Sequence, residues 1–105
     1  MKLLAVYTTV GSREDARALA SSLVEQGLVA CAQVQEIESC YRWKGALQHE
    51  PEFRLVFKTT EARYAQVEAA ILAAHPYELP AVHAVAVAHA HGPYAAWVEE
   101  GVAAA

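Results

Sequence analysis

The sequence predicts a single α+β domain whose elements follow the order β-α-β-β-α-β, with a short helix at the end. Three observations predict this order. Apolar and β-branched residues gather in stretches that favour strands, and between them lie two stretches in which apolar residues recur at helical spacing. Glycine or proline stands near most of the boundaries. We treat the 105 residues as one domain over 1–105, because single domains commonly hold about 50 to 200 residues.

The first strand is expected over residues 2–10, which are mostly apolar or β-branched. Gly11 interrupts it, and Ser12 followed by Asp15 is typical of a capped helix start. We expect the first helix to end at Gly27, because glycine commonly terminates helices. The apolar stripe of this helix is Ala16, Leu19, Ala20, Leu23 and Val24.

A long β-hairpin is predicted by residues 28–44 and by the alternating stretch 53–58, with a turn at Gly45. The first run greatly exceeds the usual five or six residues of a strand. We therefore expect a bend or bulge near Glu36–Ser39. The far end of the hairpin is expected to protrude beyond the body of so small a domain.

The second half of the chain predicts a helix, a strand and a short helix. Thr60 can cap the second helix, and His75-Pro76 ends it, because the residue before proline is driven out of the helical region. A long last strand is expected over 81–91, and a short third helix around Tyr94, Trp97 and Val98.

This order of elements is that of a ferredoxin-like sandwich, with both long helices on one face of the sheet. One side of the last strand is small and apolar and is expected under the helices. The other side needs a partner surface or water, and sheets of neighbouring subunits would cover it naturally. The first side is Val82, Ala84, Ala86, Ala88 and Ala90, and the second is His83, Val85, Val87, His89 and His91.

Composition disfavours two classes of partner. The formal net charge is −4, and the eight Lys and Arg residues are spread thinly along the chain. No basic run is available to neutralise phosphates, so we expect neither nucleic-acid binding nor docking on an anionic membrane. The apolar stretches are also shorter than the roughly 20 residues that a membrane-spanning helix needs.

The cytoplasm is the expected compartment. The first residues resemble a strand rather than a secretory signal, and no A-x-A cleavage site follows them. Cys31 and Cys40 stand nine residues apart in one extended stretch. Their Cα atoms would lie roughly 30 Å apart, against a limit of about 7 Å for a disulfide. We therefore expect two reduced thiols.

Several short motifs, in order, resemble those of the CutA family of divalent-cation tolerance proteins. Each is weak alone, but together they span Thr8 to Val98, nearly the whole chain. They are Leu28-Val29-Ala30-Cys31, Ser39-Cys40-Tyr41-Arg42-Trp43-Lys44-Gly45, Phe57-Lys58-Thr59, His75-Pro76-Tyr77-Glu78-Leu79-Pro80 and Tyr94-x-x-Trp97.

The resemblance implies a ferredoxin-like subunit in a tight homotrimer, with the hairpins of neighbouring subunits pairing edge to edge. It also implies a cytoplasmic protein of metal tolerance that binds copper or another divalent metal ion, and no known catalytic reaction. The copper ligands proposed for the family align with Tyr7, Ala74 and His75 of this sequence. Of the proposed copper ligands, only His75 transfers to this sequence.

The expected ligand cleft lies between subunits and is lined by Tyr41, Trp43, Lys58, His75 and Tyr77. Each of these residues also has a plainer interpretation. Tyr41 and Trp43 can simply pack against a neighbouring subunit, and Lys58 can be solvated. The ring of His75 can bond a carbonyl at the end of its helix.

The candidate metal ligands are His75, Cys40, His89 and His91. His89 and His91 would share one face of the last strand about 7 Å apart, although solvated histidines are the plainer interpretation. Cys40 stands nearer the polar end of its strand and is the expected exposed thiol. Cys31 is expected to be a buried, inert hydrophobe.

Three functions stay open at this point. The first is a homotrimeric cation-tolerance protein, and the second is a small-molecule sensor or an uncharacterised enzyme that uses the inter-subunit cleft. The third is a scaffold for protein partners. The sequence has no Ser-His-Asp spacing, no phosphate-binding glycine loop and no Cys-x-x-Cys, so it offers little support for an enzyme.

Overall fold

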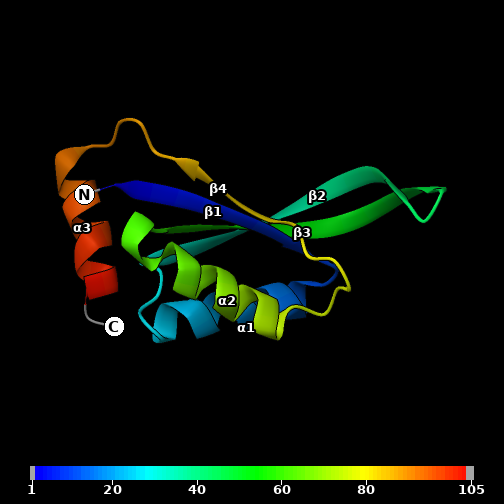
Figure 1. The fold of residues 1–105 in the computed structure, drawn as a ribbon, viewed down its shortest axis with the longest axis horizontal. Coiled ribbons are helices and arrows are strands. Elements are labelled where there is room, and N and C mark those ends of the chain that lie inside the picture. The colour runs from blue at the N-terminus through cyan, green and yellow to red at the C-terminus, as the bar shows by residue number, and fades with distance from the viewer. Residues whose placement is uncertain (1, 104–105) are drawn as a thin grey trace.

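The computed structural model describes residues 2–103, with the side chains of residues 2–102. It is elongated, with extents of 45 × 25 × 21 Å. One antiparallel sheet has the strand order β2-β3-β1-β4, and α1 and α2 lie together against one face of it (Figure 1). The elements are β1 (Leu3–Val10), α1 (Arg13–Glu25), β2 (Cys31–Trp43), β3 (Ala46–Thr60), the 3₁₀ helix η1 (Glu61–Arg63), α2 (Tyr64–Ala74), β4 (Val82–Ala86) and α3 (Gly92–Ala103).

Local sequence sets both ends of α1. The hydroxyl of Ser12 accepts a hydrogen bond from the backbone N–H of Asp15 at 3.0 Å, as the capping pattern predicted. At the other end Gly27 has a φ of 71°. The N–H of Leu28 bonds the carbonyl of Leu23, and that of Gly27 bonds the carbonyl of Val24. This is a Schellman motif, which confirms the predicted stop.

The hairpin of β2 and β3 is more regular than expected, and its return strand β3 is longer. Its register runs without interruption from Cys31 opposite Lys58 to Trp43 opposite Ala46. The expected bend or bulge near Glu36–Ser39 is therefore wrong, because a two-stranded ribbon beyond the sheet can accommodate its twist without an extra residue.

Only Lys44 and Gly45 join the two strands, with φ values of 50° and 80°. Two consecutive residues with positive φ are the signature of a tight two-residue hairpin turn, and the turn predicted at Gly45 is confirmed. The strand β2 begins at Cys31 rather than at residue 28. Leu28 and Val29 instead pack into the core.

The core lies between the sheet and the pair α1 and α2. Alternation along β1 and β3 directs every second side chain toward these helices. The face opposite the helices stays uncovered along most of the sheet (Figure 1). The core residues are Leu4, Val6, Val10, Ala16, Leu19, Leu23, Leu28, Val29, Leu55, Phe57, Val67 and Ile71, with Val82 and Ala84 packed against them.

The last strand is shorter than predicted. β4 covers only Val82–Ala86, and its pairing with β1 ends at Ala86 opposite Leu4. One further bond joins the N–H of Val87 to the carbonyl of Leu3, where β1 itself begins. Residues 87–91 have no strand left to pair with, so the prediction of a strand over 81–91 is wrong beyond residue 86.

The second helix begins through η1, and the expected cap is wrong in detail. Thr60 stands at the N-cap position, but its side chain makes no capping hydrogen bond. The end of α2 is as predicted, because His75 leaves the helical region with a ψ of 133°.

The helix α3 packs against the start of β2. A Cβ on Gly101 would lie 2.9 Å from the Cβ of Ala30, so only glycine allows this close approach. The helix is longer than the short segment expected, with 12 residues. No helix within residues 2–103 is long and apolar enough to cross a membrane.

Candidate functional site

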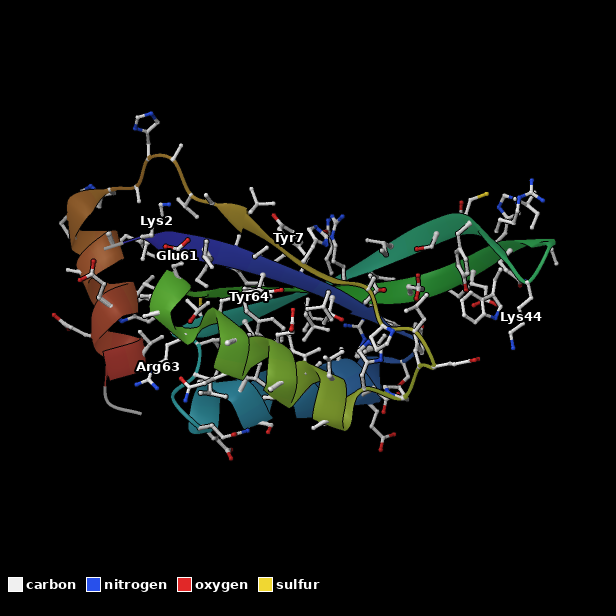
Figure 2. The ribbon with its side chains drawn as sticks, viewed as in Figure 1. Lys2, Tyr7, Lys44, Glu61, Arg63 and Tyr64 are labelled. Carbon is white, nitrogen blue, oxygen red and sulfur yellow. The ribbon has the colours of Figure 1, made fainter. Side chains whose placement is uncertain are left out.

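A cleft of about 680 Å³ lies where the hairpin leaves the body of the domain. The hairpin forms one wall and the segment 77–81, which follows α2, forms the other. Lys44 marks the far tip of the hairpin in Figure 2. The residues that line the cleft are Thr9, Ser39, Cys40, Tyr41, Trp43, Glu50, Glu52, Tyr77, Glu78, Leu79 and Ala81.

A buried acid forms the floor of the cleft. Glu52 is only 6% exposed, and its Oε2 accepts a hydrogen bond of 2.7 Å from the hydroxyl of Tyr77. Burial, together with this bond and the charge of Glu52, raises the pKa of the Tyr77 hydroxyl well above its usual value of 10.0. Tyr77 therefore stays protonated and donates to the carboxylate across the physiological range.

Two further carboxylates line the walls. Glu50 accepts a hydrogen bond of 3.3 Å from the hydroxyl of Tyr41, and partial burial with this neighbouring charge raises the pKa of that hydroxyl. Glu78 lies 3.5 Å from the ammonium of Lys44. The same ammonium lies 5.6 Å from the centre of the Trp43 ring. The cleft thus combines aromatic walls with acidic groups.

His75 lies behind the cleft and supports Tyr77. The backbone N–H of Tyr77 can only donate, so its 3.2 Å bond to Nδ1 of His75 makes Nδ1 an acceptor. The proton of the neutral ring is then on Nε2, which donates to the carbonyl of Thr9 at 2.8 Å. Both ring nitrogens are engaged, so His75 would have to release one of these bonds to bind a metal ion.

Of the other cleft candidates, Tyr41, Trp43 and Tyr77 come together and Lys58 does not. Lys58 donates to Oε1 of Gln33 at 3.0 Å. Strand alternation places both side chains on the uncovered face of the sheet, the side on which Figure 2 shows Tyr7.

The metal candidates do not form a cluster. His89 and His91 are exposed and lie in the irregular segment between β4 and α3, so the strand geometry expected for them is wrong. Cys40 is exposed and free, as expected, and Cys31 is free but only partly buried. Within residues 2–103 no group of three His, Cys, Asp or Glu side chains is arranged to hold a metal ion.

Sequence reasoning missed His49, and it favoured an exposed loop position for Glu52, which instead lies in β3 and is buried. Nε2 of His49 lies 3.6 Å from Sγ of Cys40, and Glu52 is the buried acid beneath Tyr77. The turn at Gly45 could have revealed the first contact, because a two-residue turn places Cys40 directly opposite His49. The contact of Glu52 with Tyr77 joins strand β3 to a distant loop, and no local signal in the sequence predicts it.

The fold and the cleft together define a class: a ferredoxin-like α+β subunit with a long projecting hairpin and a cleft at the base of that hairpin. A family model described as CutA1 divalent ion tolerance protein matches residues 4–101. The chain therefore belongs to the CutA1 family, and its role lies in the tolerance of divalent metal ions.

Individual relatives agree with this assignment. The divalent-cation tolerance protein CutA of Thermotoga maritima is 34% identical over 100 residues, which cover 95% of this chain and 99% of that protein. The protein of the same name from Thermus thermophilus is 36% identical over 96 residues, covering 90% and 93%.

Solved structures match closely as well. CutA from Synechococcus elongatus superposes with a TM-score of 0.93 at 34% identity, covering 96% of this chain and 90% of that one. A structure described as the periplasmic divalent cation tolerance protein CutA from Archaeoglobus fulgidus also gives 0.93, at 29% identity, covering 95% and 98%. The ferredoxin-like fold predicted from the order of elements is confirmed.

Proposed function

We propose that the chain works as a cytoplasmic homotrimer that binds copper or another divalent metal ion at the cleft beside its hairpin. The observation that carries this proposal is the acidic lining of the cleft. Glu50, Glu52 and Glu78 lie around one space, and carboxylates are ligands of divalent cations. One chain does not supply a closed ligand set, so a neighbouring subunit would complete it.

The free edges of the hairpin support assembly. β2 is an edge strand of 13 residues, and β3 pairs with β1 only over Phe53–Thr60. Both outer edges of the projecting hairpin therefore carry unpaired backbone groups, which readily pair with another chain. Pairing of hairpins between subunits would satisfy these groups.

The uncovered face of the sheet supports assembly as well. Val85 lies on this face and is 51% exposed. Tyr7 stacks on His83 there, with ring centres 5.1 Å apart. An apolar and aromatic sheet face of this kind is stabilised when a second sheet covers it.

A matched pair of variants tests the assembly. Val85→Glu places a charge on the uncovered face, whereas Leu72→Glu places one on the outer side of α2, where Leu72 is 47% exposed. Sedimentation should show a trimer for the wild type and for Leu72→Glu, and monomers for Val85→Glu. A wild-type monomer that is well folded at low micromolar concentration would overturn the trimer.

Metal binding at the cleft is tested by calorimetry. The wild type should bind Cu²⁺ saturably, and Glu50→Gln should weaken the affinity about tenfold, because affinity follows the number of charged ligands. Glu25→Gln is the control, since it removes one exposed charge at the end of α1. Equal affinities of the two variants would contradict binding at the cleft.

The size and aromatic lining of the cleft favour a small-molecule ligand as the second candidate. Its volume of about 680 Å³ is in the usual range for ligand sites of about 300–1,000 Å³. A melting temperature raised by a metabolite and not by metal ions would support this function. A chain that responds to neither would be left with the scaffold function.

The cytoplasm is the proposed compartment. The cytoplasm fits the two free cysteines, but relatives are described by other compartments, chloroplastic in Arabidopsis thaliana and periplasmic in Archaeoglobus fulgidus. Fractionation of cells that carry the untagged chain, probed with an antibody, tests it directly.

A further inference from the structure

A thiol and an imidazole face each other across the outer part of the hairpin. Cys40 and His49 are direct partners in the ladder of β2 and β3, and Sγ of Cys40 lies 3.6 Å from Nε2 of His49. We propose that this pair is a second metal site, selective for thiophilic ions such as Zn²⁺ or Cu⁺. The inference deepens the proposed function and rests on it for the metal-handling role, but it uses separate ligands.

The separation of the two atoms fits shared coordination. Metal–sulfur and metal–nitrogen bonds of about 2.3 Å and 2.0–2.1 Å at the tetrahedral angle place the two ligand atoms about 3.5–3.6 Å apart. The observed 3.6 Å agrees with this value. A zinc ion could therefore bind both atoms without a change in the backbone of either strand.

The backbone holds the two ligands in place. The ladder continues past the pair on both sides, from Ser39 opposite Glu50 to Tyr41 opposite Gln48. The two-residue turn fixes this register. Preformed geometry lowers the cost of ordering the ligands, because neither strand has to move to bring them together.

The ligand types set the class of ion. Thiolate selects Zn²⁺ and Cu⁺, and imidazole is compatible with both, whereas carboxylates suit harder cations. Cys40 is itself among the residues around the cleft, but its side chain and that of His49 project from the opposite face of the hairpin to Tyr41 and Glu50.

Binding of the metal ion displaces one proton from the pair. The thiol of Cys40 releases its proton to solvent as the metal–sulfur bond forms, and neutral His49 donates the lone pair of Nε2. Cys40 is exposed, so an ion has access to it. Water, or a side chain of a neighbouring subunit, would occupy the remaining coordination positions.

Titration of the full chain with Cd²⁺ in the presence of a phosphine reductant tests the site. Cd²⁺ replaces Zn²⁺ as the probe because thiolate binding gives an ultraviolet charge-transfer band. The wild type should show this band with saturation at one ion per chain. Cys40→Ser should abolish it, and His49→Ala should keep the band but weaken the affinity about tenfold or more.

Two matched controls use the other residues of the same types. Cys31→Ser and His89→Ala should leave the band and the affinity unchanged. A band that persists in Cys40→Ser, or equal affinity in His49→Ala and His89→Ala, overturns the site. Far-ultraviolet circular dichroism of each variant shows that it is folded.

The cleft variant Glu50→Gln separates this proposal from the proposed function. If its Cu²⁺ affinity falls about tenfold while Cd²⁺ gives no thiolate band in the wild type, the cleft stands and the thiol site fails. If the band is present and Glu50→Gln binds Cu²⁺ like the wild type, the thiol site stands and the cleft fails.

Discussion

The two halves of the β2–β3 ladder differ in how far their side chains are buried, although one register runs through both. In the body of the domain Phe57 is fully buried beneath α1 and α2. In the projecting half Leu47 is 62% exposed. The β2–β3 ladder itself is continuous through both halves, so within this ladder the difference lies in side-chain burial.

This difference separates stability from binding. Burial of apolar surface stabilises the body, whereas the projecting half displays its side chains to solvent or to a partner. The pair of Cys40 and His49 and the free strand edges belong to the projecting half, and the cleft lies at its base, between the hairpin and the segment 77–81. The proposed binding sites therefore lie on or beside the part of the chain that contributes least to the core.

The largest expected effect tests this contrast directly. Phe57→Ala should lower the free energy of unfolding by about 3–5 kcal/mol, because it leaves a cavity in the core. Leu47→Ala should change it by about 0.5 kcal/mol or less, because the side chain is already exposed. Urea denaturation at fixed protein concentration measures both. Similar losses in the two variants would show that the outer hairpin is packed in the assembled protein.

The next largest effect is expected at the hydrogen bond between Tyr77 and Glu52, where the hairpin meets the body of the domain. Tyr77→Phe removes the hydroxyl that donates to Glu52 and leaves a buried carboxylate without that donor. The expected loss is about 1–3 kcal/mol at neutral pH, measured by urea denaturation. A Tyr77→Phe protein as stable as the wild type would mean that water replaces the hydroxyl.

The same bond predicts a pH dependence with a definite sign. The pKa of Tyr77 is raised in the folded state, so the unfolded chain loses this proton first. The contribution of Tyr77 to stability is therefore complete below pH 10 and falls as the pH rises above that value. The difference in stability between the wild type and Tyr77→Phe should shrink from about pH 10 upward. A difference that stays constant would contradict the raised pKa.

The smallest effect concerns an ion pair that links the body to the hairpin. Arg13 at the start of α1 lies 3.2 Å from Glu36 of β2 and 4.8 Å from the centre of the Phe53 ring. Both charged side chains are about half exposed or more, so Glu36→Gln should cost about 0.2–1 kcal/mol. The loss should shrink at high salt. A loss that salt does not alter would indicate that packing of Glu36, and not its charge, matters.

The sequence predicted those features that neighbouring residues decide. Ser12 and Gly27 set the ends of α1 within a few residues of themselves, and His75 before Pro76 does the same for α2. The order of elements then left few possible folds. The ordered motifs on the hairpin and after α2 identified the family.

Features decided by distant partners were not predicted. The length of β4 depends on where β1 begins, at Leu3, and not on the alternating residues of β4. The contact of Glu52 with Tyr77 joins segments 25 residues apart. His89 and His91 stand two residues apart, a spacing that would place them on one face of a strand. Residues 87–91 pair with no strand, so this spacing does not fix where the two side chains lie.

The turn of only two residues at Lys44-Gly45 has a consequence for how this hairpin can change. If the turn kept its two residues, one added residue would slide one strand by one position, and every side chain of that strand would exchange faces. The acids of the cleft would then point where the sulfur now lies, and the sulfur would lose the ring opposite it. Added residues therefore preserve both surfaces only where they widen the loop and leave the ladder in register, so the tip constrains how the hairpin can change in length.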